Sequence, residues 1–214
     1  QAEQSIHAVD SLKEFFARGR HVGRPNVTGG KVFLDQNQPS VWNDAGDEYF
    51  HGRSIIPRMS KIKQPNSRHC FICGLENPIG LHLHFYETEP GVVETIYTAP
   101  DHFQGYPGVL HGGIVAAILD ETSGRAFMGS ADAPRFMFTG KLEVKYRKNV
   151  SVGKPLKIVG KAIKDRKKFV EAWAGIYDES GELLAEANAI HINVPQGKLD
   201  MSQLDELGWK VYPD

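Results

Sequence analysis

The sequence predicts an α+β fold in which one long helix packs against one curved antiparallel sheet. Residues 111–128 are apolar on nearly every side, which is typical of a buried helix. Two strand-like runs precede this helix, and four more follow it with short turns between them. This order indicates one helix packed against one sheet.

The first predicted strand covers residues 81–85, where Leu81, Leu83 and Phe85 alternate with His82 and His84. Alternation places three apolar side chains on one face of a strand. Residues 92–98 form the second predicted strand, and a loop rich in Gly and Pro leads from it to the helix.

The predicted helix over 111–128 leaves little polar surface, so it must be covered on most sides. The runs 138–147, 156–164, 169–177 and 183–194 are the predicted strands that wrap it, with residues 178–181 as the turn of the last hairpin. A buried helix wrapped by an antiparallel sheet is the hotdog fold. Because such a sheet keeps an open edge and an apolar face, a homodimer or a dimer of dimers is expected.

The flanking regions differ from this domain, which is predicted to cover residues 67–195. Residues 1–66 form an extension, with one amphipathic helix candidate and then a stretch rich in Gly, Pro, Asn and Asp. The extension either docks on the main domain or forms a poorly ordered tail. Residues 196–214 form a C-terminal tail.

The overall composition excludes two classes of function. A net charge of −1 gives no general attraction to nucleic acid. No apolar run approaches the roughly 20 residues that span a bilayer. The chain begins with Gln1, so a removed targeting segment stays possible, and a cytoplasmic location is the default expectation.

A stripe of small side chains runs along one face of the predicted helix and contains a single carboxylate, Asp120. The stripe comprises Gly113, Ala116, Ala117, Asp120 and Gly124. Small residues at this spacing leave a groove, and an unpaired carboxylate within it is energetically costly. Asp120 therefore serves either a catalytic role or a structural ion pair with Arg125 or Arg135.

The start of the helix provides hydrogen-bond donors. Backbone N–H groups in the first turn lack partners within the helix, and Gly112 and Gly113 carry no side chain to keep a ligand away. Such donors stabilise the negative charge that develops on a carbonyl oxygen under nucleophilic attack.

Two segments together resemble the hotdog thioesterase superfamily. The first is residues 108–121, Gly-Val-Leu-His-Gly-Gly-Ile-Val-Ala-Ala-Ile-Leu-Asp-Glu. The second is Cys70-Phe71-Ile72-Cys73-Gly74, followed by Asn77-Pro78 and Gly80-Leu81. The resemblance covers residues 67–194 and is greatest to the branch of phenylacetyl-CoA thioesterases and mammalian acyl-CoA thioesterases.

This resemblance implies hydrolysis of an acyl-CoA, with coenzyme A as part of the substrate and no separate cofactor. It assigns Asp120 as general base or nucleophile and the Gly113 N–H as the group that polarises the carbonyl. Thr139 would help to position water across the dimer. Some relatives carry Asn where this chain has Gly105, and Gln104 is the candidate to replace that amide.

Two residues beside this set have alternative roles. His111 is a candidate general base, but it lies about 180° around the helix from Asp120, which favours a role in capping the helix. Glu121 is a rival carboxylate that lies about 100° from Asp120.

Cys70 and Cys73 allow a local disulfide, half of a metal site, or two free thiols. A zinc site would also need His69, His82 or His84. The resemblance implies no metal, and no metal is predicted.

Two basic clusters are candidates for the phosphates of coenzyme A: Arg147 and Lys148 at a strand end, and Lys167 and Lys168 in the next turn. Solvated hairpin charges are the alternative. For the whole chain, the alternatives to a thioesterase are a hotdog hydratase or dehydratase and a non-catalytic acyl-CoA-binding module.

Overall fold

A computed structural model describes residues 61–129, 133–166, 168–195, 198, 204 and 206–213. The amphipathic helix candidate in the N-terminal extension lies outside the described residues. Within them, no helix is long and apolar enough to cross a membrane.

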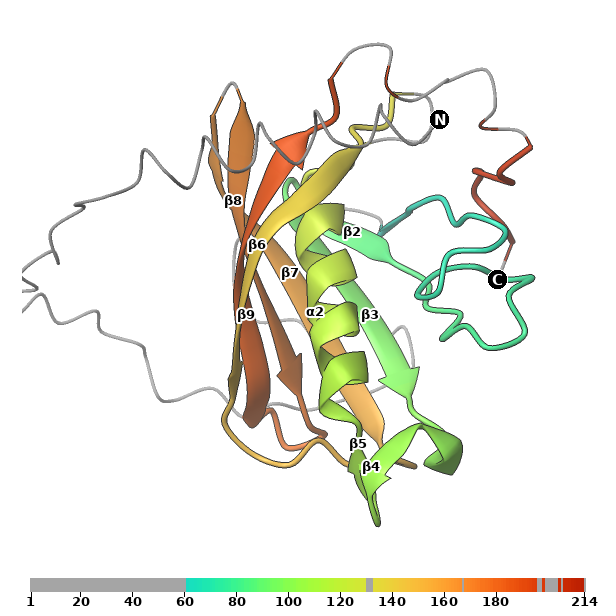
Figure 1. Cartoon of the computed structure of the whole chain (residues 1–214), viewed down its shortest axis with the longest axis vertical. Coiled ribbons are helices and arrows are strands. Elements are labelled where there is room, and N and C mark those ends of the chain that lie inside the picture. The colour runs from blue at the N-terminus through green and yellow to red at the C-terminus, as the bar shows by residue number, and fades with distance from the viewer. Residues whose placement is uncertain are drawn as a thin grey trace, which may run out of the picture. The chain divides into compact units, whose positions relative to one another are not determined.

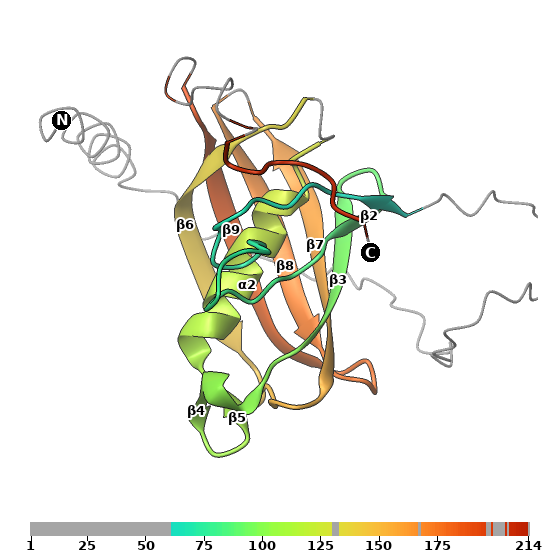
Figure 2. The same cartoon turned by 90° about the vertical axis from the view of Figure 1, so that its right-hand side faces the viewer.

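One helix crosses one face of a twisted antiparallel sheet in the described part of the chain (Figures 1 and 2). The strands lie in the order β1-β2-β3-β7-β8-β9-β6, and β4 and β5 form a separate pair. The elements are β1 (Ile62–Lys63), β2 (Tyr86–Glu89), β3 (Val92–Thr98), a 3₁₀ turn (Asp101–Phe103), β4 (Gln104–Tyr106), β5 (Val109–Leu110), α2 (Gly112–Arg125), β6 (Met137–Tyr146), β7 (Pro155–Asp165), β8 (Phe169–Tyr177) and β9 (Leu183–Asn193).

The core lies between α2 and the central strands. Val115, Ile118 and Leu119 are buried on the inner side of the helix. The helix approaches β7 closely at Gly160, where a Cβ atom would lie 2.3 Å from the carbonyl oxygen of Thr122. A side chain at this position would therefore push the helix off the sheet.

The hotdog arrangement predicted from the sequence is confirmed, and β3 and β8 have the predicted bounds. The observed helix is shorter than the predicted one, because His111 is its N-cap and Ala126 is its C-cap. Alternating apolar residues predicted these elements well because each strand buries one face.

The prediction of a strand over 81–85 is wrong. Leu81, Leu83 and Phe85 are buried as expected, but the segment makes no strand ladder. Its backbone instead pairs with the turn before it, with Leu83 N–H donating to Ile72 at 2.9 Å. His82 has a φ of 56°, which interrupts an extended strand.

Two surfaces of the described domain stay uncovered in a single chain. The small-residue stripe of α2 is half-buried or exposed in a single chain, rather than enclosed. Strand β6 lies at the sheet edge, and its Phe138 and Tyr146 side chains are exposed. An open edge strand of this length is a ready template for pairing with another strand.

Candidate active site

Asp120 lies midway along α2 beside the edge strand β6. The Thr139 hydroxyl donates a hydrogen bond to Asp120 Oδ1 at 2.8 Å. A pocket opens beside this pair, with Gly124 of the helix and the apolar side chains of Met128 and Met137 in its lining. The resemblance implied that Thr139 positions water across a dimer, and within one chain its hydroxyl contacts Asp120 directly.

His191 on β9 lies behind this pair, and sequence reasoning missed it. Its ring nitrogens are 2.8 Å from Ser123 Oγ and 3.5 Å from Thr139 Oγ1. The side chain is buried and also lines the pocket. Asp120, Thr139 and His191 therefore form one connected polar group.

The hydrogen bonds assign the tautomer of His191. Ser123 donates its single hydroxyl proton to the carbonyl oxygen of Asp120 at 2.8 Å, so its oxygen must accept from Nε2–H of His191. Nδ1 of the neutral ring then presents a lone pair toward Thr139. Burial lowers the pKa of His191, and the negative charges of Asp120 and Glu121 oppose this effect only in part.

The ion pairs predicted as an alternative for Asp120 are made by other carboxylates. Nε of Arg125 donates to Glu121 at 2.8 Å, and the guanidinium of Arg135 binds Asp165 through two hydrogen bonds. The hypothesis of a structural Asp120–Arg pair is therefore wrong for this structure. The rival carboxylate Glu121 is already engaged by a cation.

His111 caps the helix, as the sequence analysis favoured. Its Nδ1 accepts a hydrogen bond from the Gly113 N–H at 3.0 Å. The expectation that the Gly113 N–H is a free donor is thus wrong, because the cap occupies it. Gly112 is different: within the described residues, its N–H has no hydrogen-bond acceptor.

The Gly112 backbone is held by the edge strand. Tyr146 at the end of β6 donates its hydroxyl to the Gly112 carbonyl oxygen at 2.8 Å. A Cβ added at Gly112 would meet this tyrosine ring at 3.6 Å, which is ordinary contact. The first turn therefore keeps a fixed position and has a free donor.

Gln104 lies on β4, and its side chain closes the hairpin. Its Oε1 accepts a hydrogen bond from the Gly108 N–H at 3.0 Å. The neighbouring Gly105 packs against His111, since a Cβ added there would lie 3.2 Å from the imidazole ring. Gln104 thus holds the loop that leads into the helix.

The helix start and Asp120 are far apart within one chain. Asp120 follows Gly112 by eight positions in the helix, which corresponds to a rise of about 12 Å along the helix axis. A carbonyl oxygen bound to the Gly112 N–H would lie beyond the reach of the carboxylate in the same chain. The two groups therefore cannot act on one thioester carbonyl within a single copy.

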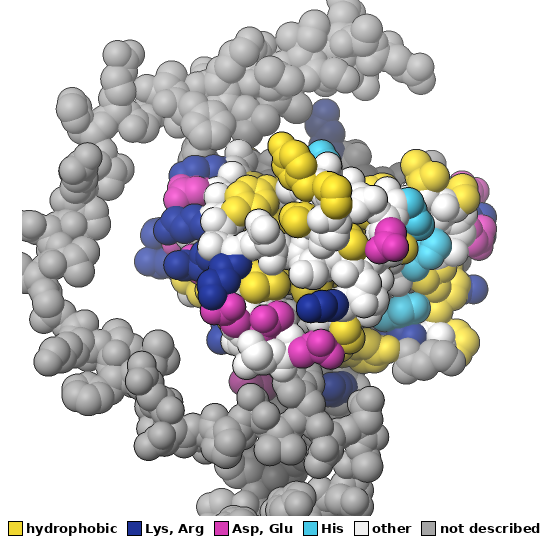
Figure 3. All heavy atoms as spheres, turned by 90° about the horizontal axis from the view of Figure 1, so that it is seen from below, with side chains coloured by type: hydrophobic (Ala, Val, Ile, Leu, Met, Phe, Trp, Pro, Cys, Tyr) yellow, Lys and Arg dark blue, Asp and Glu magenta, His cyan; other side chains and the backbone are white. Residues whose placement is uncertain are grey.

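The predicted basic clusters lie at opposite ends of the sheet. Arg147 and Lys148 follow β6 near the helix start, whereas Lys168 precedes β8 at the other end; Lys167 lies outside the described residues. Arg147 pairs with Glu186, and Lys148 pairs with Glu182. On the face seen from below, basic side chains gather on one side, with acidic ones among them (Figure 3).

Cys70 and Cys73 are free thiols in the structure, which is one of the three alternatives that their spacing allowed. The Cys73 thiol lowers the pKa of Cys70 to about 7 through a hydrogen bond, although burial opposes the shift. The same hydrogen bond, together with burial, raises the pKa of Cys73. His82, which the sequence offered as a partner of the cysteines in a zinc site, instead lies with its Nε2 2.6 Å from the carbonyl oxygen of Asn77.

Comparison with known proteins finds similar sequences and a similar fold. Residues 107–185 match the model of the thioesterase superfamily. The acyl-coenzyme A thioesterase THEM4 of Rattus norvegicus is 25% identical over 166 residues, covering 76% of this chain and 68% of the relative. THEM4 of Mus musculus is 26% identical over 147 residues, covering 67% of this chain and 62% of the relative.

A similar fold occurs in a crystal structure of a thioesterase superfamily protein, with a TM-score of 0.54 and 24% sequence identity. The match covers 58% of this chain and 60% of that one. It supports the hotdog architecture alone. The region that matches the family model, residues 107–185, includes the helix start, Asp120 and Thr139, but ends before His191.

Proposed function

We propose that this protein hydrolyses acyl-CoA thioesters to a free acid and coenzyme A, because residues 107–185 match the model of the thioesterase superfamily. The observation that carries the proposal is the Asp120–Thr139 pair beside an open pocket. The Thr139 hydroxyl fixes one carboxylate oxygen of Asp120. The other oxygen is then oriented to attack the thioester carbon, or to remove a proton from an attacking water.

Polarisation of the carbonyl is assigned to the Gly112 N–H rather than to that of Gly113. A free N–H at a helix start stabilises the oxyanion that forms during attack, helped by the positive end of the helix dipole. Because Gly112 and Asp120 are too far apart in one chain, the proposed site takes the donor from one copy and the carboxylate from another. The exposed edge of β6 is the proposed surface for pairing.

Coenzyme A enters this proposal as part of the substrate, with no separate cofactor. Arg147 and Lys148 are the proposed contacts for its phosphates, because both are exposed and lie near the helix start. Binding would require each cation to exchange its glutamate partner for a phosphate oxygen.

Hydration of an unsaturated acyl-CoA is the second candidate, since a histidine and an aspartate line the same pocket. His191 is buried, however, and its ring nitrogens face Ser123 and Thr139 rather than open space. A ring held in this way is better suited to orienting Thr139 than to transferring a proton directly to a substrate.

The test is release of free thiol from a panel of acyl-CoAs, measured with wild type and Asp120→Asn. We expect the variant to fold normally and to lose about 10²–10⁴-fold in kcat, the usual effect of removing a general base. Asp101→Asn is a matched control, because Asp101 is an exposed carboxylate outside the site. Undiminished turnover by Asp120→Asn would exclude the proposed role, and loss of an unsaturated acyl-CoA without thiol release would favour hydration.

A further inference from the structure

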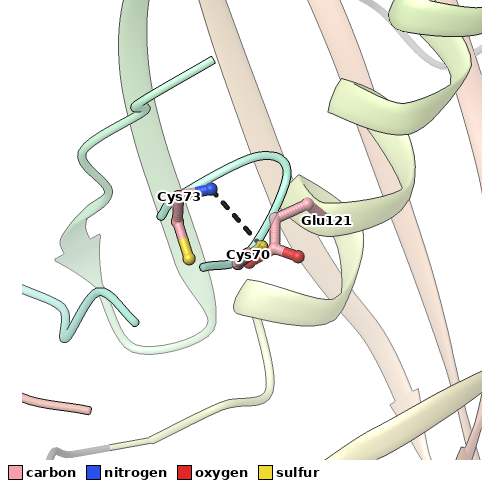
Figure 4. Close-up of side chains that lie close together, drawn as sticks. All are labelled: Cys70, Cys73 and Glu121. Carbon is pink, nitrogen blue, oxygen red and sulfur yellow. Dashed lines mark hydrogen bonds between the residues drawn. The ribbon is translucent and has the colours of Figure 1, made fainter. Parts of the chain in front are cut away.

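A cluster of potential metal ligands lies on the side of α2 next to Asp120. It consists of Cys70, Cys73 and Glu121, whose sulfur and carboxylate oxygen atoms all lie within 4.8 Å of one another. The two cysteines come from the turn before β2, and Glu121 comes from the C-terminal half of α2 (Figure 4). Segments far apart in the chain thus bring three ligand groups together.

The turn that carries the cysteines is built to stabilise a thiolate. The N–H groups of Ile72 and Cys73 point to Cys70 Sγ at 3.3 and 3.4 Å. Gly74 donates to the Cys70 carbonyl oxygen at 2.9 Å, and a Cβ at Gly74 would lie 2.3 Å from that oxygen. The tight turn therefore depends on this glycine, and it places both sulfur atoms beside the helix.

The charges around the cluster favour a divalent cation. Arg125 is fully buried and binds Glu121 through Nε at 2.8 Å. Two thiolates and one carboxylate carry three negative charges, which one divalent cation and the Arg125 guanidinium neutralise together. Without a metal, ionisation of both thiols would leave unbalanced negative charge beside the core, which is costly.

We propose that Cys70, Cys73 and Glu121 bind a zinc ion with two thiolates and one carboxylate oxygen, leaving a fourth position for water. Thiolate ligands select zinc over magnesium or calcium, which prefer oxygen ligands. In tetrahedral zinc sites the ligand atoms lie roughly 3.3–3.8 Å apart, so closure requires shifts of about 1 Å. The second carboxylate oxygen of Glu121 can keep its bond to Arg125, which would orient the ligand.

Such an ion would fasten the turn before β2 to the helix residue adjoining Asp120. The site differs from the zinc hypothesis considered from the sequence, because Glu121 replaces the histidines as third ligand. The expectation of no metal rested on the family resemblance and on a cysteine spacing that supplies only half of the usual zinc pattern.

Metal binding is tested on the reduced full-length chain with Zn²⁺ and Co²⁺ as probes. Wild type should bind one zinc per chain, and the cobalt form should show a sulfur-to-metal charge-transfer band. Cys70→Ser and Cys73→Ser should each lose the band, and Glu121→Gln should weaken zinc binding at least tenfold. Glu76→Gln should bind as wild type does, because Glu76 is an exposed carboxylate on the same turn, outside the cluster.

Three results would overturn the proposal. They are zinc uptake below one equivalent by the reduced wild type, unchanged zinc affinity in Glu121→Gln, and a cobalt spectrum without thiolate bands. Circular dichroism of each metal-free variant separates loss of a ligand from loss of fold. A Cys→Ser variant that unfolds without metal is replaced by Cys→Ala at the same position, for which the same loss of the band is expected.

Discussion

At the scale of single residues, the buried ring of His191 lies behind the hydrogen-bonded pair of Asp120 and Thr139. With Nε2–H committed to Ser123, the neutral ring offers Nδ1 to Thr139, while the Thr139 proton goes to the nearer acceptor, Asp120. Burial lowers the pKa of His191 and so disfavours the protonated ring, which would place a positive charge beside the carboxylate.

This environment predicts a loss of stability in acid. Because burial lowers the pKa of His191, the unfolded state binds its proton more readily than the folded state does. The stability contributed by the neutral ring is complete above the unfolded pKa of about 6.5 and is lost as pH falls through the folded value. Thermal unfolding between about pH 7.5 and 5 should therefore show a smaller fall in Tm for His191→Gln than for wild type. Parallel curves would contradict this assignment.

The exposed cations near the helix start predict a defect in substrate binding rather than in chemistry. Replacing Arg147 and Lys148 by Ala should raise KM for acyl-CoA with little change in kcat, because phosphate contacts lie far from the thioester. The double variant should treat an acyl-pantetheine substrate, which lacks the nucleotide, as wild type does. An equal rise in KM for both substrates would show that these residues do not contact the nucleotide. Lys154→Ala is a matched control for the loss of an exposed cation.

At the scale of elements, the first turn of α2 permits one N–H group to be deleted without removing a side chain. Proline is well tolerated at the first helical position, and His111 already has the extended backbone that precedes proline, with φ −59° and ψ 132°. Gly112→Pro should therefore fold normally but lower kcat about 10²–10³-fold, the usual effect of deleting one oxyanion donor.

The matched control for this variant is Gly112→Ala, which keeps the N–H and adds a methyl group in ordinary contact with Tyr146. Its kcat should stay within a few-fold of wild type. Equal losses in both variants would mean that the turn tolerates no added atoms and that the N–H has no separate role. Circular dichroism confirms folding in each case.

The strands show which parts of this architecture the sequence could predict. β3 and β8 were located within their observed bounds because apolar residues alternate between turns. The segment 81–85 has the same alternation but is no strand, since its partners come from a turn whose position no local pattern reveals. Residues at every second position of β9, Ala185, Ala187 and Ala189, are buried, and His191 continues that face. A histidine on a buried face was the available signal for His191.

The candidate site was predictable where it depends on one helix and not where it depends on packing. Asp120 stood out as the lone polar group in a stripe of small residues. The occupied N–H of Gly113 could not be foreseen, because it depends on the rotamer of the His111 cap. The cluster of Glu121 with Cys70 and Cys73 likewise arises only when the turn before β2 packs on the helix.

At the scale of the whole molecule, the edge strand β6 and the distance between Gly112 and Asp120 lead to the same proposal. Both are explained if two copies pair so that the helix start of one faces the carboxylate of the other. A symmetric pair would contain two such sites, each using one residue from each copy. Sedimentation at micromolar concentration should accordingly show a dimer or a dimer of dimers, with no stable monomer.

The sharpest consequence is that two inactive variants should restore activity when combined. In a mixed dimer of Asp120→Asn and Gly112→Pro, one site receives both defects and the other receives the intact Gly112 of one copy and the intact Asp120 of the other. Random pairing after joint refolding in equal amounts makes half of the dimers mixed, so turnover should recover to about a quarter of the wild-type value. If both groups acted within a single copy, the mixture would stay as inactive as its components, because every copy carries one defect. Refolding each variant alone is the control, and a mixture without recovered thiol release, despite mixed dimers detected by mass spectrometry, would contradict the shared site.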